Sequence, residues 1–222
     1  MSKNETKGKR EGSRLIFSYL EHRRTIGILG IALPVVMYVG AKIFFCTDLQ
    51  HAISQYYHTG MRDVFVGILW CMGIFFLSYR GYERKDDIAG DIAAVSIIGV
   101  SISPSVESAC YQCQGFWVEY AHYTLAAIFF ITLSIFCIHL FTKSDQPKPY
   151  KPEKQKRNKI YRACGYTIIA CIIIIGIYDL MIKGKLDWLD KIQPVFWLEA
   201  IALWAFGLSW LVKGGAIATD QK

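Results

Sequence analysis

Histidine and carboxylate side chains that could bind a metal or move a proton recur at helical spacing near the ends of apolar segments. His51, Ser54 and His58 are spaced i, i+3, i+7, and Glu119 and His122 are spaced i, i+3, so each set would share one face of a helix. A Glu-x-x-His pair that projects into a helix bundle can ligate a metal ion. The pattern therefore makes His58, Glu119 and His122 candidate ligands of Zn²⁺, whose bound water would have a pKa of about 7.

Three further carboxylates could support such a centre. Asp63 opens the second apolar segment, Asp179 lies near the end of the fifth, and Glu199 lies inside the sixth. They could act as a general base or orient a ligand histidine. The same residues could instead line a pocket for a lipid, a small molecule or an ion, or form a structural polar network. The pocket candidates are Ser54, His58, Asp63, Glu119, His122, Asp179 and Glu199.

Six apolar segments must position these side chains. A helix needs about 20 mainly apolar residues to cross a bilayer. Four segments meet that length easily, while the second and third are short, and whether those two cross fully is left open. We therefore predict an all-α, polytopic transmembrane bundle of about six spans. The segments are 26–46, 63–79, 88–104, 117–141, 160–182 and 194–212.

The basic residues are divided unevenly between the two sides that six spans would create. Of the 25 Lys and Arg residues, all but five precede the first segment, follow the last, or lie in or directly beside the second and fourth connections. This positive-inside pattern predicts that both termini are cytoplasmic. The net charge of +7 then points to anionic lipid headgroups at the cytoplasmic face rather than to nucleic acid. The five exceptions are Lys42, Arg62, Lys183, Lys185 and Lys191.

The basic stretches divide the chain into four parts. We expect residues 1–14 to lack regular structure. Pro147, Pro149 and Pro152 should prevent a helix in the fourth connection. The predicted parts are a basic cytoplasmic N-terminal segment (1–24), a four-span part (25–141), the basic cytoplasmic connection (142–159) and a two-span part with a short cytoplasmic tail (160–222).

Two local patterns predict structure within these parts. Thr47, with Gln50 three residues later, matches a capping box and predicts a helix over 48–59 on the outer membrane surface. Gly27 and Gly30 in the first segment, and Gly207 in the last, are small residues that would allow close approach of neighbouring helices.

Three cysteines lie on the predicted outer side. Cys110 and Cys113 form a Cys-x-x-Cys pair, and Cys46 ends the first segment. The outer side of a bacterial inner membrane is oxidising, so we predict a disulfide between Cys110 and Cys113, or between one of them and Cys46. A redox role would need a helix N-terminus that lowers the pKa of the first cysteine.

Several stretches resemble a family of uncharacterised bacterial multi-pass membrane proteins. They are residues 56–67, residues 79–82, and the run from Trp197 to Gly214. The resemblance implies a multi-pass protein of the bacterial inner membrane and supplies no activity.

A shorter motif is similar to a second group. Ser54-x-x-x-His58 resembles the Ser-x-x-x-His element of the alkaline ceramidase and adiponectin-receptor superfamily of membrane hydrolases. Its members have seven spans and a late His-x-x-x-His, whereas this chain has six apolar segments and no histidine after His139.

Three functions remain open on these observations. The first is an outward-facing polar pocket that binds or conducts a lipid, a small molecule or an ion. The second is a metal-dependent membrane hydrolase, and the third is an effector or accessory subunit that acts through homo-oligomers. The sequence contains no phosphate-binding Walker loop, no dinucleotide-binding glycine pattern and no nucleophile elbow.

Overall fold

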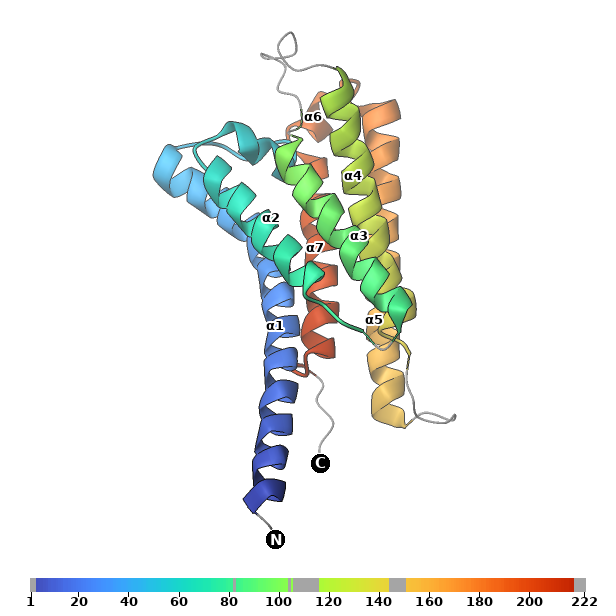
Figure 1. Cartoon of the computed structure of the whole chain (residues 1–222). Helices are drawn as coiled ribbons and strands as arrows, with labels where there is room; N and C mark the ends of the chain where they lie inside the picture. Colours follow the sequence, from blue (N-terminus) through green and yellow to red (C-terminus); the bar gives the residue numbers. More distant parts are fainter. Residues whose placement is uncertain (1–2, 82, 104, 106–115, 144–150, 218–222) are drawn as a thin grey trace.

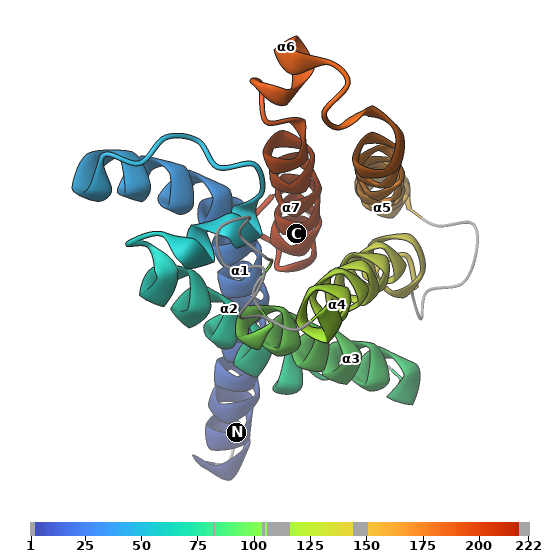
Figure 2. The same cartoon turned by 90° about the horizontal axis from the view of Figure 1, so that it is seen from above.

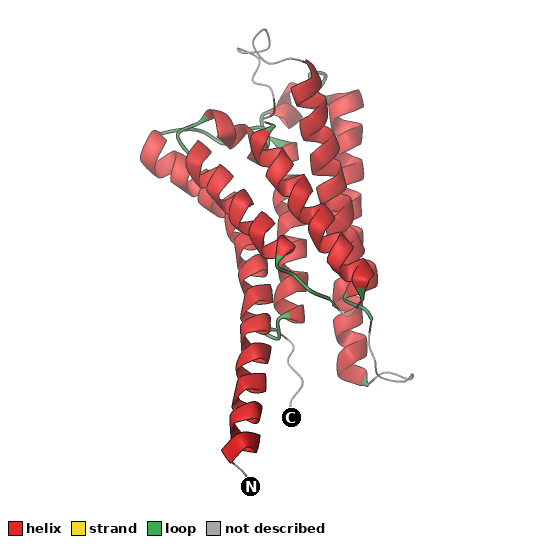
Figure 3. Ribbon diagram, viewed as in Figure 1, coloured by secondary structure: helices red, strands yellow, loops and turns green. Residues whose placement is uncertain are grey.

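The computed structural model describes residues 3–81, 83–103, 105, 116–143 and 151–217, with the backbone alone for residues 3–18, Phe116, Glu119 and Asp187. Helices are the only regular secondary structure in these residues (Figures 1 and 3), so the predicted all-α class is confirmed. The α-helices are α1 (Lys3–Phe45), α2 (Arg62–Leu77), α3 (Arg84–Ile102), α4 (Phe116–Ile135), α5 (Pro152–Ile177), α6 (Asp187–Asp190) and α7 (Pro194–Lys213). A 3₁₀-helix, η1 (Ile53–His58), precedes α2, and π-helical turns η2 (Phe136–Leu140) and η3 (Tyr178–Ile182) extend α4 and α5.

Four of the described helical stretches are long and apolar enough to cross a bilayer. They belong to α1, α4, α5 and α7, which suggests a membrane protein. α2 has only 16 residues, and α3 begins with four charged residues in succession. Crossing by α2 and α3, and with it the count of about six spans, stays a prediction. The four stretches are Tyr19–Phe45, Tyr120–Leu140, Pro152–Ile182 and Pro194–Lys213.

α1 and α7 form the most extensive helix pair, and two glycines face each other where they meet. A Cβ atom on Gly207 would lie 2.6 Å from the carbonyl oxygen of Gly27, and one on Gly27 would lie 2.8 Å from the carbonyl oxygen of Gly207. The absence of side chains lets the backbones come this near, so the close approach predicted at these glycines is confirmed, and the structure adds that they face each other. α7 also packs against α5, while α2, α3 and α4 pack in chain order (Figure 2).

The two ends of the bundle hold different parts of the chain. α1 begins and α7 ends at one end, the termini end, where the α2–α3 connection and the start of α5 also lie (Figure 1). The opposite end, the η1 end, holds η1, α6 and the start of α7. Pro34 lies within α1, where its missing N–H interrupts the hydrogen-bond ladder. The second half of α1 leans away from α7 (Figures 1 and 2).

Two predictions about connecting segments are wrong. Residues 3–14 are not without regular structure, because α1 begins at Lys3; extending an existing helix needs no new nucleus. Pro152 does not prevent a helix either. It lies in the first turn of α5, where a missing N–H costs no hydrogen bond, so the connection predicted to end at residue 159 ends at Lys151.

The predicted helix over 48–59 is also wrong in extent. Only η1, Ile53–His58, is helical there, and residues 46–50 have no regular structure. α1 continues to Phe45, and Cys46 then takes a left-handed backbone conformation with φ of 50°. Before and at the start of η1, the carbonyl of His51 and the N–H of Ile53 bond to Phe196 and Glu199 of α7.

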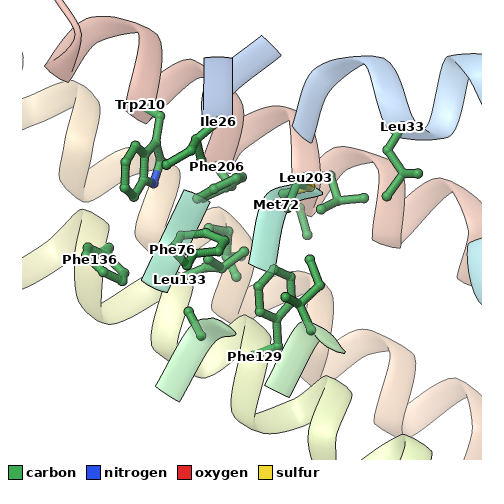
Figure 4. Packing of buried hydrophobic residues seen from close by; sticks show 14 of the residues in the cluster. Ile26, Leu33, Met72, Phe76, Phe129, Leu133, Phe136, Leu203, Phe206 and Trp210 are labelled. Carbon is green, nitrogen blue, oxygen red and sulfur yellow. The ribbon is translucent and has the colours of Figure 1, made fainter. Parts of the chain in front are cut away.

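The interior near the termini end is filled by rings. This aromatic cluster consists of Phe76, Tyr79, Phe136, Phe141, Phe206 and Trp210, and no member is more than 2% exposed. The ring centroid of Phe76 lies 5.6 Å from that of Trp210, which lies 5.2 Å from those of Tyr79 and Phe141. These are favourable separations for aromatic pairs. Figure 4 shows several of these rings converging from α2, η2 and α7.

Candidate functional site

The interior near the η1 end holds a pocket in place of packed rings. The pocket lies among α1, α2, α3, α4 and α7, with η1 along its wall, and encloses about 500 Å³ counting its open mouth. Its polar side chains are Ser54, His122 and Glu199, and the rest of the wall is apolar. The apolar wall includes Leu33, Phe65, Leu69, Ile97, Phe129 and Leu203.

One face of α2 forms a large part of that wall. Phe65, Leu69 and Met72 are spaced i, i+4, i+7 and all line the pocket, as helical geometry requires for residues on one face. All three are almost fully buried. The polar groups therefore lie in a low-dielectric surrounding, where a hydrogen bond to a ligand would be stronger than in water.

Residues His51–His58, here called the η1 strap, are fastened to the beginning of α7. The backbone N–H of Phe196 donates to the His51 carbonyl at 2.9 Å, and the N–H of Ile53 donates to Oε2 of Glu199 at 2.7 Å. Nδ1 of His51 lies 3.0 Å from Oε1 of Gln193. Since the first N–H groups of a helix have no partner within it, the strap satisfies one of them and places Ile53 and Ser54 at the pocket.

Glu199 serves both the strap and the pocket. One carboxylate oxygen accepts the N–H of Ile53, and the side chain lines the pocket. Glu199 is on α7, within a stretch apolar enough to span a membrane, where a carboxylate is costly and usually faces the bundle interior. Its position is consistent with that rule.

His122 is 4% exposed and enters the pocket from α4. Its Nδ1 lies 2.6 Å from the carbonyl oxygen of Ser103. A carbonyl can only accept, so Nδ1 carries the proton in this contact. The bond fixes the orientation of the imidazole ring at the wall.

Three of the seven pocket candidates are therefore brought together: Ser54, His122 and Glu199. His58 points elsewhere, with Nε2 lying 2.5 Å from the Ser105 carbonyl oxygen. Asp63 is exposed and borders a different groove. Asp179 is exposed on η3; its carboxylate lies 3.8 Å from Nε2 of His51 and 3.7 Å from Nζ of Lys183.

The proposed zinc ligands do not meet as a described set. In the part of the chain that the structure describes, no three His, Cys, Asp or Glu side chains are placed to hold one metal ion. His58 and His122 each contact a backbone carbonyl instead. The side chain of Glu119 lies outside the described residues, so the ligand set that includes it stays a prediction.

The predicted disulfide is likewise not tested. Cys46 is exposed and forms no disulfide with another described cysteine. Cys110 and Cys113 lie outside the described residues.

Sequence reasoning missed the residues that hold the strap. Gln193 was not a candidate, although a polar residue directly before Pro194 marks the start of a helix. His51 was noted for its spacing, but its carbonyl and ring both face α7. The apolar residues of the pocket wall could not be identified from the sequence, because they are of the same types as the apolar residues exposed on the surface of the bundle.

This chain matches no protein-family model, and no curated protein or solved structure was found to be similar to it.

Proposed function

We propose that this protein binds a small amphiphile in the interior pocket. The apolar part of the ligand lies between α2, α4 and α7, and its polar head lies at Ser54, His122 and Glu199. The observation that carries this proposal is the composition of one wall: three polar side chains from three different elements set among apolar ones. Such walls are typical of small-molecule sites, where a few polar groups fix the orientation.

The polar groups favour a head that donates hydrogen bonds. Glu199 uses one oxygen for the N–H of Ile53, and no described residue donates to its other oxygen. An ionised carboxylate only accepts. A hydroxyl or an amine on the ligand would therefore suit this position better than a second carboxylate.

Binding is better supported than conduction. A conducting path needs polar groups or water along its whole length. Towards the termini end the interior is occupied by the aromatic cluster, in which Phe76 contacts Phe129, Phe136, Phe206 and Trp210. An ion that entered from the η1 end would meet packed rings.

We also propose the topology and location that the charge pattern and the family resemblance predict. α2 and α3 complete six spans, both termini are cytoplasmic, and the protein resides in the bacterial inner membrane. The η1 end then faces the periplasm. A periplasm-active reporter fused after Lys222 is expected to be inactive, and activity there would overturn the orientation.

Thermal unfolding in detergent with three ten-carbon probes tests the binding proposal. 1-Decanol and decylamine are expected to raise the midpoint more than decane, because only they carry a donor. A ligand at about 100 times its Kd would stabilise the protein by about 2.7 kcal/mol.

A matched pair of variants separates binding from effects on the detergent. Ala126→Phe fills the pocket from α4, whereas Ile131→Phe lies on the same helix with a side chain that is 49% exposed. The midpoint shift should vanish in Ala126→Phe and persist in Ile131→Phe. Equal shifts in both variants would contradict the proposal.

A further inference from the structure

A second hollow lies on the opposite side of α2, outside the bundle interior. This groove runs between α2 and the end of α3. Its volume is about 850 Å³, which includes the space at its open side. Val66, Gly67 and Trp70 line it from α2, and Ser101 and Ile102 line it from α3. α2 thus separates two sites: one of its faces forms the interior pocket and another forms this groove.

Two opposite charges stand at the η1 end of the groove. Arg62 and Asp63 begin α2, and both are exposed. The guanidinium of Arg62 donates to the hydroxyl of Tyr57 at 2.6 Å and stacks over its ring, with Cζ 4.4 Å from the ring centroid. Within the described residues neither Arg62 nor Asp63 forms an ion pair. A positioned cation and an anion beside it are therefore both available to a ligand.

The floor of the groove is apolar and open. A Cβ atom on Gly67 would meet no atom within 4 Å, so the floor is hollow at this residue. Trp70 is 43% exposed and Ile102 is 64% exposed. These side chains would contact a hydrocarbon chain that lies along α2.

The charged end of the groove lies at the end of the bundle where the apolar stretches end. The apolar stretches of α1 and α5 end at Phe45 and Ile182, and that of α7 begins at Pro194, all at the η1 end. Arg62 and Asp63 begin α2 at this same end (Figure 1). Lipid headgroups lie at this depth, and acyl chains lie below it.

We propose that this groove binds one zwitterionic phospholipid. Its phosphate pairs with Arg62, its ammonium pairs with Asp63, and an acyl chain lies over Gly67 against Trp70. Charge complementarity selects this occupant. An anionic lipid would leave Asp63 facing the like charge of the phosphate, while a zwitterionic headgroup carries both signs a few bonds apart. A charge-assisted contact to phosphate is the stronger kind of hydrogen bond, and arginine is suited to it.

Lipid retention tests the proposal on the full chain. The protein would be placed in nanodiscs of equimolar phosphatidylethanolamine and phosphatidylglycerol, and the lipids that remain bound would be counted by native mass spectrometry. Wild-type protein is expected to retain phosphatidylethanolamine in preference to phosphatidylglycerol. Gly67→Leu should reduce that retention about tenfold, because its side chain starts from a Cβ position that no atom approaches within 4 Å and occupies the floor of the groove.

Gly176→Leu is the matched control. Gly176 is also a helical glycine whose Cβ would meet nothing within 4 Å, but it lies on α5. Retention in this variant should equal that of the wild type. Arg62→Gln should weaken retention of both lipids, and Asp63→Asn should shift the preference toward phosphatidylglycerol, since the repulsion of an anionic headgroup is removed.

Several outcomes would overturn the proposal. They are unchanged phosphatidylethanolamine retention in Gly67→Leu, a wild-type preference for phosphatidylglycerol, and a lipid ratio that Asp63→Asn leaves unaltered. Arg62 and Asp63 are surface residues, so their variants remain informative if Gly67→Leu fails to fold.

Discussion

The two halves of the bundle interior differ in how they are filled. Near the termini end, rings from α2, η2 and α7 pack against one another. Near the η1 end, α1 leans away from α7 past Pro34, and a pocket with three polar side chains lies among the helices. In a membrane, helices associate through side-chain packing, because lipid tails are as apolar as the side chains and no hydrophobic driving force acts between helices. The half packed with rings therefore stabilises the fold, while the half near the η1 end has room for a ligand.

The largest expected effect distinguishes a ring in the packed half from a ring at the pocket. Phe76→Ala should destabilise the protein by about 3–5 kcal/mol, the range for truncating a buried aromatic side chain. Phe65→Ala should cost clearly less, because one side of the Phe65 ring already faces the pocket and has fewer contacts to lose. The free energy of unfolding, measured by SDS titration in mixed micelles, checks this. Equal losses of unfolding free energy in Phe76→Ala and Phe65→Ala would contradict the proposed difference between the two halves.

The seam between α1 and α7 should be the next most sensitive feature. Gly207→Val would force a side chain against the backbone of Gly27, and overpacking of this kind costs about 1–3 kcal/mol or more. Gly176→Val serves as the control, since a Cβ atom at this position would meet no atom within 4 Å. The same SDS titration measures both variants. A Gly207→Val protein as stable as the Gly176→Val protein would contradict the assigned packing.

A smaller, local effect is expected at the η1 strap. Glu199→Leu removes the acceptor of the Ile53 N–H, and an unsatisfied buried donor costs about 1–3 kcal/mol. Glu199→Gln keeps an oxygen that can accept this bond. Hydrogen exchange over residues 51–58 should therefore speed up in Glu199→Leu and stay close to wild type in Glu199→Gln. Identical exchange in both variants would show that Glu199 does not hold the strap.

The smallest effect concerns a charged group at the termini end. Nζ of Lys143 lies 3.1 Å from carboxylate oxygens of both Glu83 and Asp86. Partial burial alone would lower the pKa of Lys143, but the two carboxylates raise it above its ordinary value. Its pairing then stabilises the folded state below the unfolded pKa of about 10.4 and is lost as pH rises through the folded pKa.

The matching experiment compares wild type with Lys143→Met across pH. The wild type should be more stable by up to about 1 kcal/mol near neutral pH, and as the pH is raised from neutral the difference should begin to shrink only above about pH 10. Thermal midpoints in detergent at several pH values measure it. If the stability difference between the two proteins shrinks on acidification but not above about pH 10, its pH dependence comes from the carboxylates alone, which would contradict the prediction.

The sequence predicted the fold where a physical constraint left one solution. Gly27 and Gly207 could be assigned to close helix contacts because small residues let helices approach in a membrane, but that they face each other came from the structure. Glu199 and His122 could be placed inside because ionisable groups avoid lipid. Ser54 was found only through its spacing from the histidines.

Other features depend on tertiary contacts that no local pattern encodes. Leu33 and Leu69 line the pocket, yet nothing in the sequence distinguishes them from Val64 or Ile74, which are exposed on the surface. The Thr47 and Gln50 pattern suggested a helix, but backbone groups of His51 and Ile53 bond to α7 instead. The groove beside Gly67 likewise requires the end of α3 to lie next to α2.

Photolabelling would test the contrast between the two halves most directly. A ten-carbon alcohol with a diazirine on its chain would be activated in nanodiscs containing the full chain, and the labelled residues would be mapped by mass spectrometry. The account predicts strong labelling at Leu69, Met72 and Phe129, little at Phe206 and Trp210, and loss of the strong labelling in Ala126→Phe but not in Ile131→Phe. Equal labelling of both halves, or pocket labelling that persists in Ala126→Phe, would contradict it.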